Sequence, residues 1–134
     1  MTSGPYRHSD WSRARRVLAV RLDAIGDVLM TTPALRALKR AKRGRHLTLL
    51  TSAAGAEIAR LVPEIDDVIA YQAPWMRASV NIAADADRAL IERLRAGKFD
   101  AAAIFTVYSQ NPWAAALLCR LADIPRRLAH SREN

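Results

Sequence analysis

The chain has 134 residues, of which 51% are hydrophobic and 25% charged, so it can bury one hydrophobic core and is not a disordered polypeptide. The single cysteine, Cys119, excludes an internal disulfide, and no apolar run is long enough to span a bilayer. No signal peptide is readable, and these features predict a cytoplasmic protein. The formal net charge of +8 indicates an affinity for anions.

The N-terminal segment predicts a leader followed by a first strand. Residues 1–14 mix polar and helix-breaking residues without a period, which predicts a flexible leader before a domain that covers residues 15–134. The apolar run from Val17 to Leu22 then predicts a buried strand.

A turn containing Gly26 ends this run, and a helical period begins at Asp27 and extends to about Arg43. Pro33 lies inside the period, where its missing N–H predicts a kink or a restart. A strand, a turn and a helix in this order form half of a βαβ unit, in which ligands bind at the carboxyl ends of the strands. Asp27 is expected at that place.

The rest of the chain alternates between strands and helices. Strands are predicted at 47–51, 67–71, 99–107 and 126–129, and helices at 52–62, 85–96 and 112–122. Local signals support these boundaries, namely Ser52 and Asn111 as helix caps and Gly44 and Gly97 as helix stops. This alternation without an internal repeat predicts an α/β fold, a Rossmann-like doubly wound parallel sheet of about five strands.

Several familiar catalytic patterns are absent. The sequence has no P-loop, no G-x-G-x-x-G fingerprint and no G-x-S-x-G elbow. His8, His46 and His130 fall in three separate segments, which indicates no metal site. Cys119 lies in the apolar stripe of its predicted helix, so we interpret it as a core residue.

The segment from Arg21 to Leu35, R-L-D-A-I-G-D-V-L-M-T-T-P-A-L, resembles the opening of glycosyltransferase family 9, the lipopolysaccharide heptosyltransferases and their relatives. In that family a first strand runs into a G-D-x-(L/V) turn and a T-x-P-A-L helix. Weaker agreements follow in consistent order over residues 15–134, at 47–52, 62–69, 99–105, 115–118, 124–125 and 131–134.

The resemblance implies the N-terminal half of a GT-B enzyme, in which two doubly wound domains face each other across a cleft. It implies transfer of a heptose from ADP-heptose to the inner core of lipopolysaccharide, without a metal or other cofactor. The acceptor and the base lie on the N-terminal domain, and the C-terminal domain holds most of the donor nucleotide. Because the chain ends at Asn134, we expect a fragment that lacks the donor domain and is inactive alone. Contact with the cytoplasmic face of the inner membrane is also implied.

Asp27 has two interpretations. The resemblance assigns it as the general base that takes the proton from the acceptor hydroxyl. The alternative is helix capping, because a carboxylate at a helix N-terminus accepts backbone N–H bonds. Gly26 either lets the substrate approach the backbone or is required by the turn. Thr31 and Thr32 either line the acceptor cleft or bond back to the helix, and Asp23 is a second carboxylate of the same turn.

Other candidate substrate-binding residues come from two further segments. Ser109 and Gln110, with Tyr108 and Asn111, follow the fourth predicted strand and are plausible sugar-binding groups. Arg36, Lys39 and Arg40 belong to a basic stretch with no acidic residue between Asp27 and Glu57, and are expected to bind an anionic acceptor or membrane surface. The alternatives are a solvated helix face or a stand-alone module that binds anions or nucleic acid through this stretch.

Overall fold

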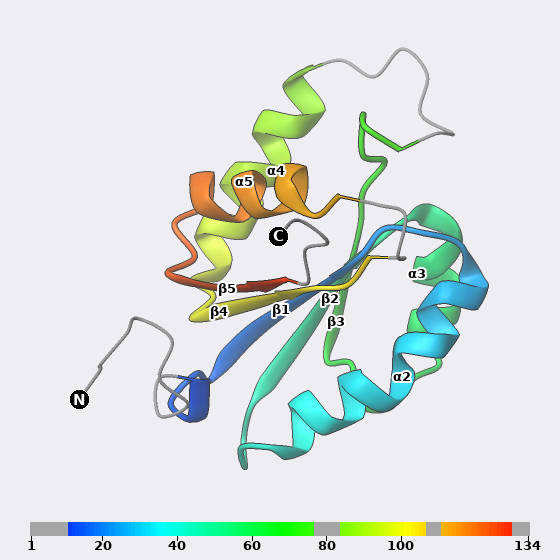
Figure 1. The fold of residues 1–134 in the computed structure, drawn as a ribbon, viewed down its shortest axis with the longest axis vertical. Helices are drawn as coiled ribbons and strands as arrows, with labels where there is room; N and C mark the ends of the chain where they lie inside the picture. Colours follow the sequence, from blue (N-terminus) through cyan, green and yellow to red (C-terminus); the bar gives the residue numbers. More distant parts are fainter. Residues whose placement is uncertain (1–10, 77–83, 107–110, 130–134) are drawn as a thin grey trace.

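The computed structural model describes residues 11–76, 84–106 and 111–129, and it forms one α/β unit (Figure 1). In chain order the elements are β1 (Arg16–Arg21), α2 (Ile25–Arg40), β2 (His46–Thr51), α3 (Ala53–Ala59), β3 (Asp67–Ala70), α4 (Ala84–Gly97), β4 (Ala101–Ile104), α5 (Trp113–Leu121) and β5 (Arg126–Ala129). The alternation predicted from the sequence is confirmed.

All five strands are parallel and lie in the order β3-β2-β1-β4-β5. The first strand is therefore central, and Val17 lies between Leu47 of β2 and Ala101 of β4. The predicted doubly wound, Rossmann-like sheet is confirmed. Such an order places helices on both faces, so the middle strand is buried on both sides, and its four central residues, Val17 to Val20, are apolar.

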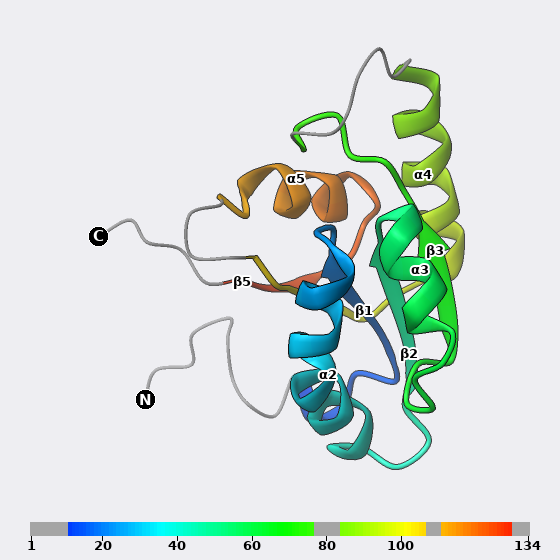
Figure 2. The same ribbon diagram turned by 90° about the vertical axis from the view of Figure 1, so that its right-hand side faces the viewer.

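The helices form two layers, with α2 and α3 on one face of the sheet and α4 and α5 on the other (Figures 1 and 2). Successive side chains of β1 point to opposite faces. Leu18 and Val20 belong to the core beneath α4 and α5, where Leu94 and Leu118 pack. Val17 and Ala19 belong to the core beneath α2 and α3, whose buried members include Val28, Leu35 and Ala59.

The predicted caps of two helices have the expected hydrogen bonds. The Ser52 hydroxyl accepts the N–H of Gly55 at 3.0 Å and begins α3. The Asn111 carboxamide oxygen accepts the N–H of Trp113 at 2.7 Å, although α5 starts one residue later than predicted, with Pro112 at the N-cap position.

The predicted helix stops differ in one case. Gly44 has φ +79° after α2, as a glycine stop requires. Gly97, in contrast, is the last residue of α4, and the left-handed residue is Lys98 with φ +50°. Gly97 is a packing residue, because a Cβ there would lie 2.7 Å from the ring of Phe99.

The first helix differs from its prediction at both ends. It starts at Ile25 and not at Asp27, because Ala24 already has the extended conformation of an N-cap, and it ends at Arg40 and not at Arg43. Pro33 lies inside one unbroken helix, so the predicted restart does not occur. Asp27 is consequently the third residue of α2.

The packed part of the chain extends upstream of the predicted boundary at residue 15. Ala14 is 1% exposed, and Trp11 packs against the core beneath α2. Arg45 donates hydrogen bonds to the carbonyl oxygens of both residues. Residues 1–10 of the predicted leader lie outside the described part. Among the helices that are described, none is long and apolar enough to cross a bilayer.

Candidate functional site

The sheet order creates a crevice at the carboxyl ends of β1 and β4. From β1 the chain continues to β2 on one side, whereas β4 lies on the other side of β1 after the crossover through α4. At such a switch point the following connections diverge to opposite faces, and this is where ligands bind in open α/β sheets.

A cavity of about 520 Å³ occupies this crevice. Its lining residues come from the ends of β1 and β4, the segment after β3 and the start of α5: Val20, Leu22, Asp23, Trp75, Met76, Ile104, Phe105, Thr106, Asn111, Trp113, Ala114 and Ala115. The wall is largely apolar and aromatic, with polar groups on Asp23, Thr106 and Asn111. This mixture is typical of a small-molecule site.

One aromatic wall of the cavity is anchored to α4. The rings of Trp75 and Tyr71 are 6.1 Å apart at an interplanar angle of 60°. The Tyr71 hydroxyl donates to the Asp87 carboxylate at 2.6 Å. Burial, together with this carboxylate, raises the pKa of Tyr71 well above its ordinary value, so the hydroxyl stays a donor. The hydrogen bond to Asp87 therefore holds the Tyr71 ring, against which Trp75 packs.

Three charged side chains meet beside the cavity, at the turn from β1 to α2. Nη2 of Arg21 lies 3.2 Å from Oδ2 of Asp23 and 3.2 Å from Oδ1 of Asp27. Because both oxygens contact the same nitrogen, they are at most twice that distance apart. The Asp23 side chain is 7% exposed, the Arg21 side chain 10% and the Asp27 side chain 34%. Asp27 is thus the more solvent-accessible of the two carboxylates.

Asp27 makes a structural contact in addition to this ion pair. Its Oδ2 accepts the N–H of Ala24 at 3.2 Å, the bond that an acidic residue at the third helical position makes back to the N-cap. The capping interpretation therefore describes a real contact. This contact leaves the carboxylate able to accept further hydrogen bonds, because each oxygen carries two lone pairs and the side chain remains accessible.

Gly26 lies next to Asp27 in the first turn of α2. Its φ is not in the left-handed region, and a Cβ placed on it would have no neighbour within 4 Å. The turn therefore does not require glycine here, which corrects one of the two interpretations from the sequence. By contrast, a Cβ on Gly55 would lie 2.2 Å from the Thr51 hydroxyl oxygen, so that glycine is needed for packing.

The two threonines of the motif both bond back to α2. The Thr31 hydroxyl donates to the carbonyl oxygen of Asp27 at 2.7 Å, and the Thr32 hydroxyl contacts that of Val28 at 3.4 Å. Thr31 is 6% exposed. These bonds are the ones that hydroxyl side chains inside helices commonly make.

The basic candidates lie far from Asp27 along the same helix. At a rise of about 1.5 Å per residue, Arg36 is about 14 Å and Arg40 about 20 Å from Asp27 along the axis. Arg36 and Arg40 lie 3.4 and 4.0 Å from the Glu64 carboxylate. The structure therefore does not bring these residues to the carboxylate site.

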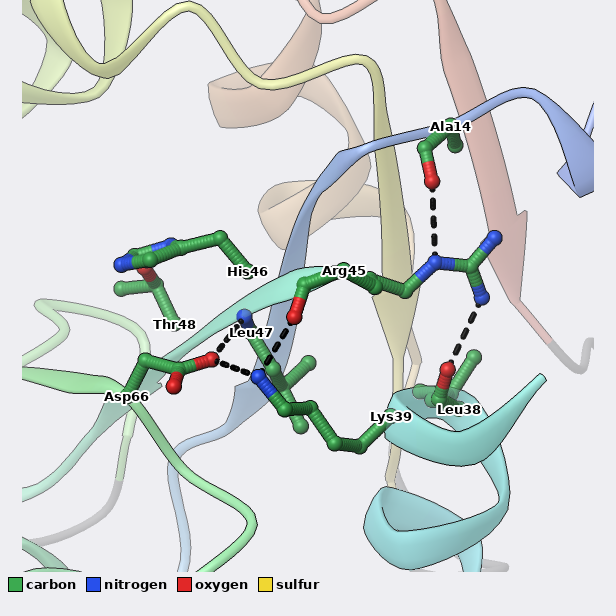
Figure 3. Close-up of polar contacts among 8 residues, drawn as sticks. All are labelled: Ala14, Leu38, Lys39, Arg45, His46, Leu47, Thr48 and Asp66. Carbon is green, nitrogen blue, oxygen red and sulfur yellow. Dashed lines mark hydrogen bonds and ion pairs between the residues drawn. The ribbon is translucent and has the colours of Figure 1, made fainter. Parts of the chain in front are cut away.

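The end of α2 near Lys39 is a network of structural contacts (Figure 3). Lys39 Nζ bonds to the Asp66 carboxylate and to the carbonyl oxygen of Arg45, each at 2.5 Å, and Asp66 also accepts the N–H of Leu47 at 2.8 Å. Burial alone would raise the pKa of Asp66, but these hydrogen bonds and the charges of Lys39 and His46 outweigh it and hold the pKa below its ordinary value.

The remaining sequence candidates carry no chemistry in the described part of the chain. Cys119 is buried, and this burial raises the pKa of its thiol to about 12, as a core residue requires. Within residues 11–76, 84–106 and 111–129, no group of three His, Cys, Asp or Glu side chains could hold a metal ion. Tyr108, Ser109 and Gln110 lie outside the described residues.

Sequence reasoning missed Arg21 and Trp113. A signal for Arg21 was present, because a cation at the end of an otherwise apolar buried strand needs an acidic partner, and two aspartates follow within six residues. Trp113 had no local signal. It is 55% exposed, and it becomes a candidate site residue because it lines the same cavity as Trp75.

Several solved structures of similar fold are glycosyltransferases. Heptosyltransferase WaaC of E. coli with bound ADP is 30% identical at a TM-score of 0.61, with 86% of this chain and 35% of that enzyme covered. A family 9 glycosyltransferase from Veillonella parvula is 21% identical at 0.69, with 87% and 32% covered. E. coli ADP-heptose lipopolysaccharide heptosyltransferase II is 20% identical at 0.66, with 85% and 30% covered.

Comparisons of the sequence alone identify no relative of this chain. No protein-family model matches the chain, and no curated protein sequence matches it. The chain spans about a third of the length of the three enzymes, so the likeness concerns one portion of each. The resemblance predicted from the segment around Asp27 is confirmed by the structural match, and the chain has the fold of one half of the GT-B heptosyltransferases of glycosyltransferase family 9.

Proposed function

We propose that the chain is the N-terminal, acceptor-side domain of a glycosyltransferase of the heptosyltransferase type. The reaction is transfer of a heptose from ADP-heptose to the inner core of lipopolysaccharide, at the cytoplasmic face of the inner membrane. The observation that carries the proposal is Asp27, an accessible carboxylate at the carboxyl end of β1 beside the switch-point cavity. The likeness to an ADP-bound heptosyltransferase supports it.

Asp27 would act as general base. As the acceptor hydroxyl attacks the anomeric carbon of the donor, its proton passes to the carboxylate, the new glycosidic bond forms and ADP leaves with the electrons of the broken bond. The carboxylate lies in the first turn of α2, next to Arg21. The scheme uses no metal, as the resemblance to glycosyltransferase family 9 implies.

The cavity would hold a sugar of the acceptor. Its two tryptophans and Met76 offer flat, apolar surface to the carbon-hydrogen faces of a pyranose ring, while Asp23, Thr106 and Asn111 offer polar groups to hydroxyls. The open space above Gly26 would let the attacking hydroxyl approach the first turn of α2. Because Arg36, Lys39 and Arg40 lie well away from Asp27, they would contact a remote anionic part of the acceptor or the membrane surface.

The donor nucleotide would be held mainly by a second domain. The chain matches only about a third of the solved enzymes, and catalysis needs donor and base held in register to within about an ångström. We therefore expect the 134-residue chain mixed with ADP-heptose and a truncated lipopolysaccharide to form no product. Transfer at the rate of a two-domain enzyme would show that the donor site lies in this chain.

The test of the base is Asp27→Asn in a form of the protein that carries a donor-binding domain. We expect kcat to fall by about 10²- to 10⁴-fold, because an amide cannot take the proton. The fold should be retained, since the amide oxygen can still accept the N–H of Ala24. Transfer is measured with ADP-heptose and a truncated lipopolysaccharide acceptor.

Two controls separate catalysis from folding. Asp123→Asn changes an exposed aspartate with positive φ, which asparagine tolerates, and should leave transfer unchanged. Thermal unfolding of both variants checks that each is folded. Near-normal turnover in folded Asp27→Asn would reduce Asp27 to a helix-capping residue and would refute the proposed mechanism.

A further inference from the structure

Arg21 is the least expected member of the carboxylate site. It is the last residue of the central strand, is 8% exposed and pairs in register with Thr51 of β2. Removing a guanidinium charge from water is energetically unfavourable, so a buried arginine requires anionic or carbonyl partners. Among the described residues, the carboxylates of Asp23 and Asp27 are such partners of Arg21.

These two partners are not equivalent. Asp23 is almost fully buried and faces the cavity, whereas about a third of the Asp27 side chain is exposed. With both carboxylates ionised, the three groups carry a net charge of −1. One carboxylate balances the arginine, and the other is an excess negative charge at the accessible end of the group.

The two oxygens of Asp27 are both oriented by the chain. Oδ1 contacts the strand through Arg21 and Oδ2 contacts the N-cap through Ala24, each at 3.2 Å. A carboxylate that is contacted at both oxygens has less freedom to turn about its side-chain torsions than one that is contacted at neither. Arg21 is the last residue of the central strand, so it connects Asp27 to a strand that is paired on both sides.

We propose that Arg21 is a positioning residue that fixes the orientation of the Asp27 carboxylate, and that Asp23 is the counter-ion that keeps Arg21 paired when Asp27 takes up a proton. Protonation of Asp27 changes the net charge of the three groups from −1 to zero. Arg21 then still faces the Asp23 carboxylate and is not left as a buried charge without an anion. The counter-ion role of Asp23 and the kinetic consequence rest on the proposed role of Asp27 as base, whereas the positioning does not.

The positioning is tested on the chain itself, without an activity assay. Three-bond NMR couplings to the side-chain carboxyl carbon of Asp27 report its χ1 torsion. We expect values of a single rotamer in the parent and averaged values in Arg21→Gln. Lys39→Gln is the matched control, because it removes a cation from Asp66 at the other end of α2 and should leave the Asp27 couplings unchanged. Unchanged couplings in folded Arg21→Gln would overturn the proposal.

A second variant covers a failure of folding. If Arg21→Gln unfolds because Asp23 is left buried without that cation, the double variant Arg21→Gln/Asp23→Asn removes the negative charge as well and serves for the same measurement. Averaged couplings in the double variant support the proposal, and single-rotamer couplings overturn it.

The kinetic consequence is tested in a form that carries a donor-binding domain. Arg21→Gln should lower kcat at least about tenfold and change the KM for the acceptor less than about threefold, and Arg21→Lys should recover part of kcat. In an Asp27→Asn background, Arg21→Gln should cause no further loss, because a residue that acts through Asp27 has nothing left to position. An equal loss in both backgrounds would overturn positioning, whereas full activity of Asp27→Asn would refute the base assignment and leave the NMR result standing.

Discussion

A buried arginine lies near each end of α2, Arg21 at the end of β1 and Arg45 just before β2, and the two arginines have different partners. At the N-terminal end, Arg21 faces two carboxylates, one of which is accessible. At the C-terminal end, Arg45 is 3% exposed and donates to the main-chain carbonyl oxygens of Ala14 and Leu38 (Figure 3). It also donates to the carbonyl oxygen of Trp11.

Arg45 has a structural role, whereas Arg21 lies beside groups that can react. Carbonyl oxygens cannot take up a proton at working pH, so the contacts of Arg45 only hold the N-terminal segment and the end of α2 to the sheet. Carboxylates can change charge, so the contacts of Arg21 lie where a proton transfer is possible. Equal residue type and similar burial therefore do not mean equal roles.

The largest effect is expected from Arg45→Gln. The change removes a charged donor from three carbonyl oxygens at once, and we expect the free energy of unfolding to fall by about 3 kcal/mol. Urea unfolding measures it. Arg43→Gln, at an exposed neighbouring position, should change stability by less than about 0.5 kcal/mol. A similar small change in both variants would contradict the structural role of Arg45.

A smaller effect is expected at Asp66, which sits beside Arg45. Its pKa is held below the ordinary value of 3.8, so its contribution to stability is complete above that pH and disappears as the pH falls through the lower folded-state value. Asp66→Asn should therefore cost about 1 kcal/mol at neutral pH and almost nothing near pH 2, since the parent has lost the same contribution there. Thermal unfolding at several pH values tests this, and a pH-independent loss would mean that the shape of the side chain, and not its charge, matters.

The smallest effect is expected from the exposed cations of the same end. Arg40→Gln combined with Arg43→Gln should leave the free energy of unfolding within about 0.5 kcal/mol, because exposed ion pairs contribute little. If this end contacts an anionic surface, flotation with phosphatidylglycerol vesicles at low salt should show about threefold weaker binding. Lys39 is kept in this variant because it holds Asp66. Equal vesicle binding by both proteins would leave a solvated face as the explanation.

The sequence determined the order and type of the elements because these follow from local features. The apolar run of β1, the helical period after it and the cap at Ser52 each depend on residues a few positions apart, and all appear where predicted to within a few residues. Asp27 could be singled out for the same reason, since a strand, a turn and a helix place it at the carboxyl edge of any parallel sheet.

What only the tertiary structure decided was which charges and rings meet. Read along the chain, the stretch from Arg36 to Arg45 has no acid near it, but β3 is preceded by Glu64 and Asp66, which the fold brings to the end of α2. Trp75 follows β3 and Trp113 begins α5, so they are far apart in sequence, yet both line one cavity in the fold. Contacts between side chains of different elements depend on the order of the strands, which hydrophobic periodicity does not encode. The basic stretch therefore has acidic partners that the sequence did not indicate. The cavity could not be predicted for the same reason.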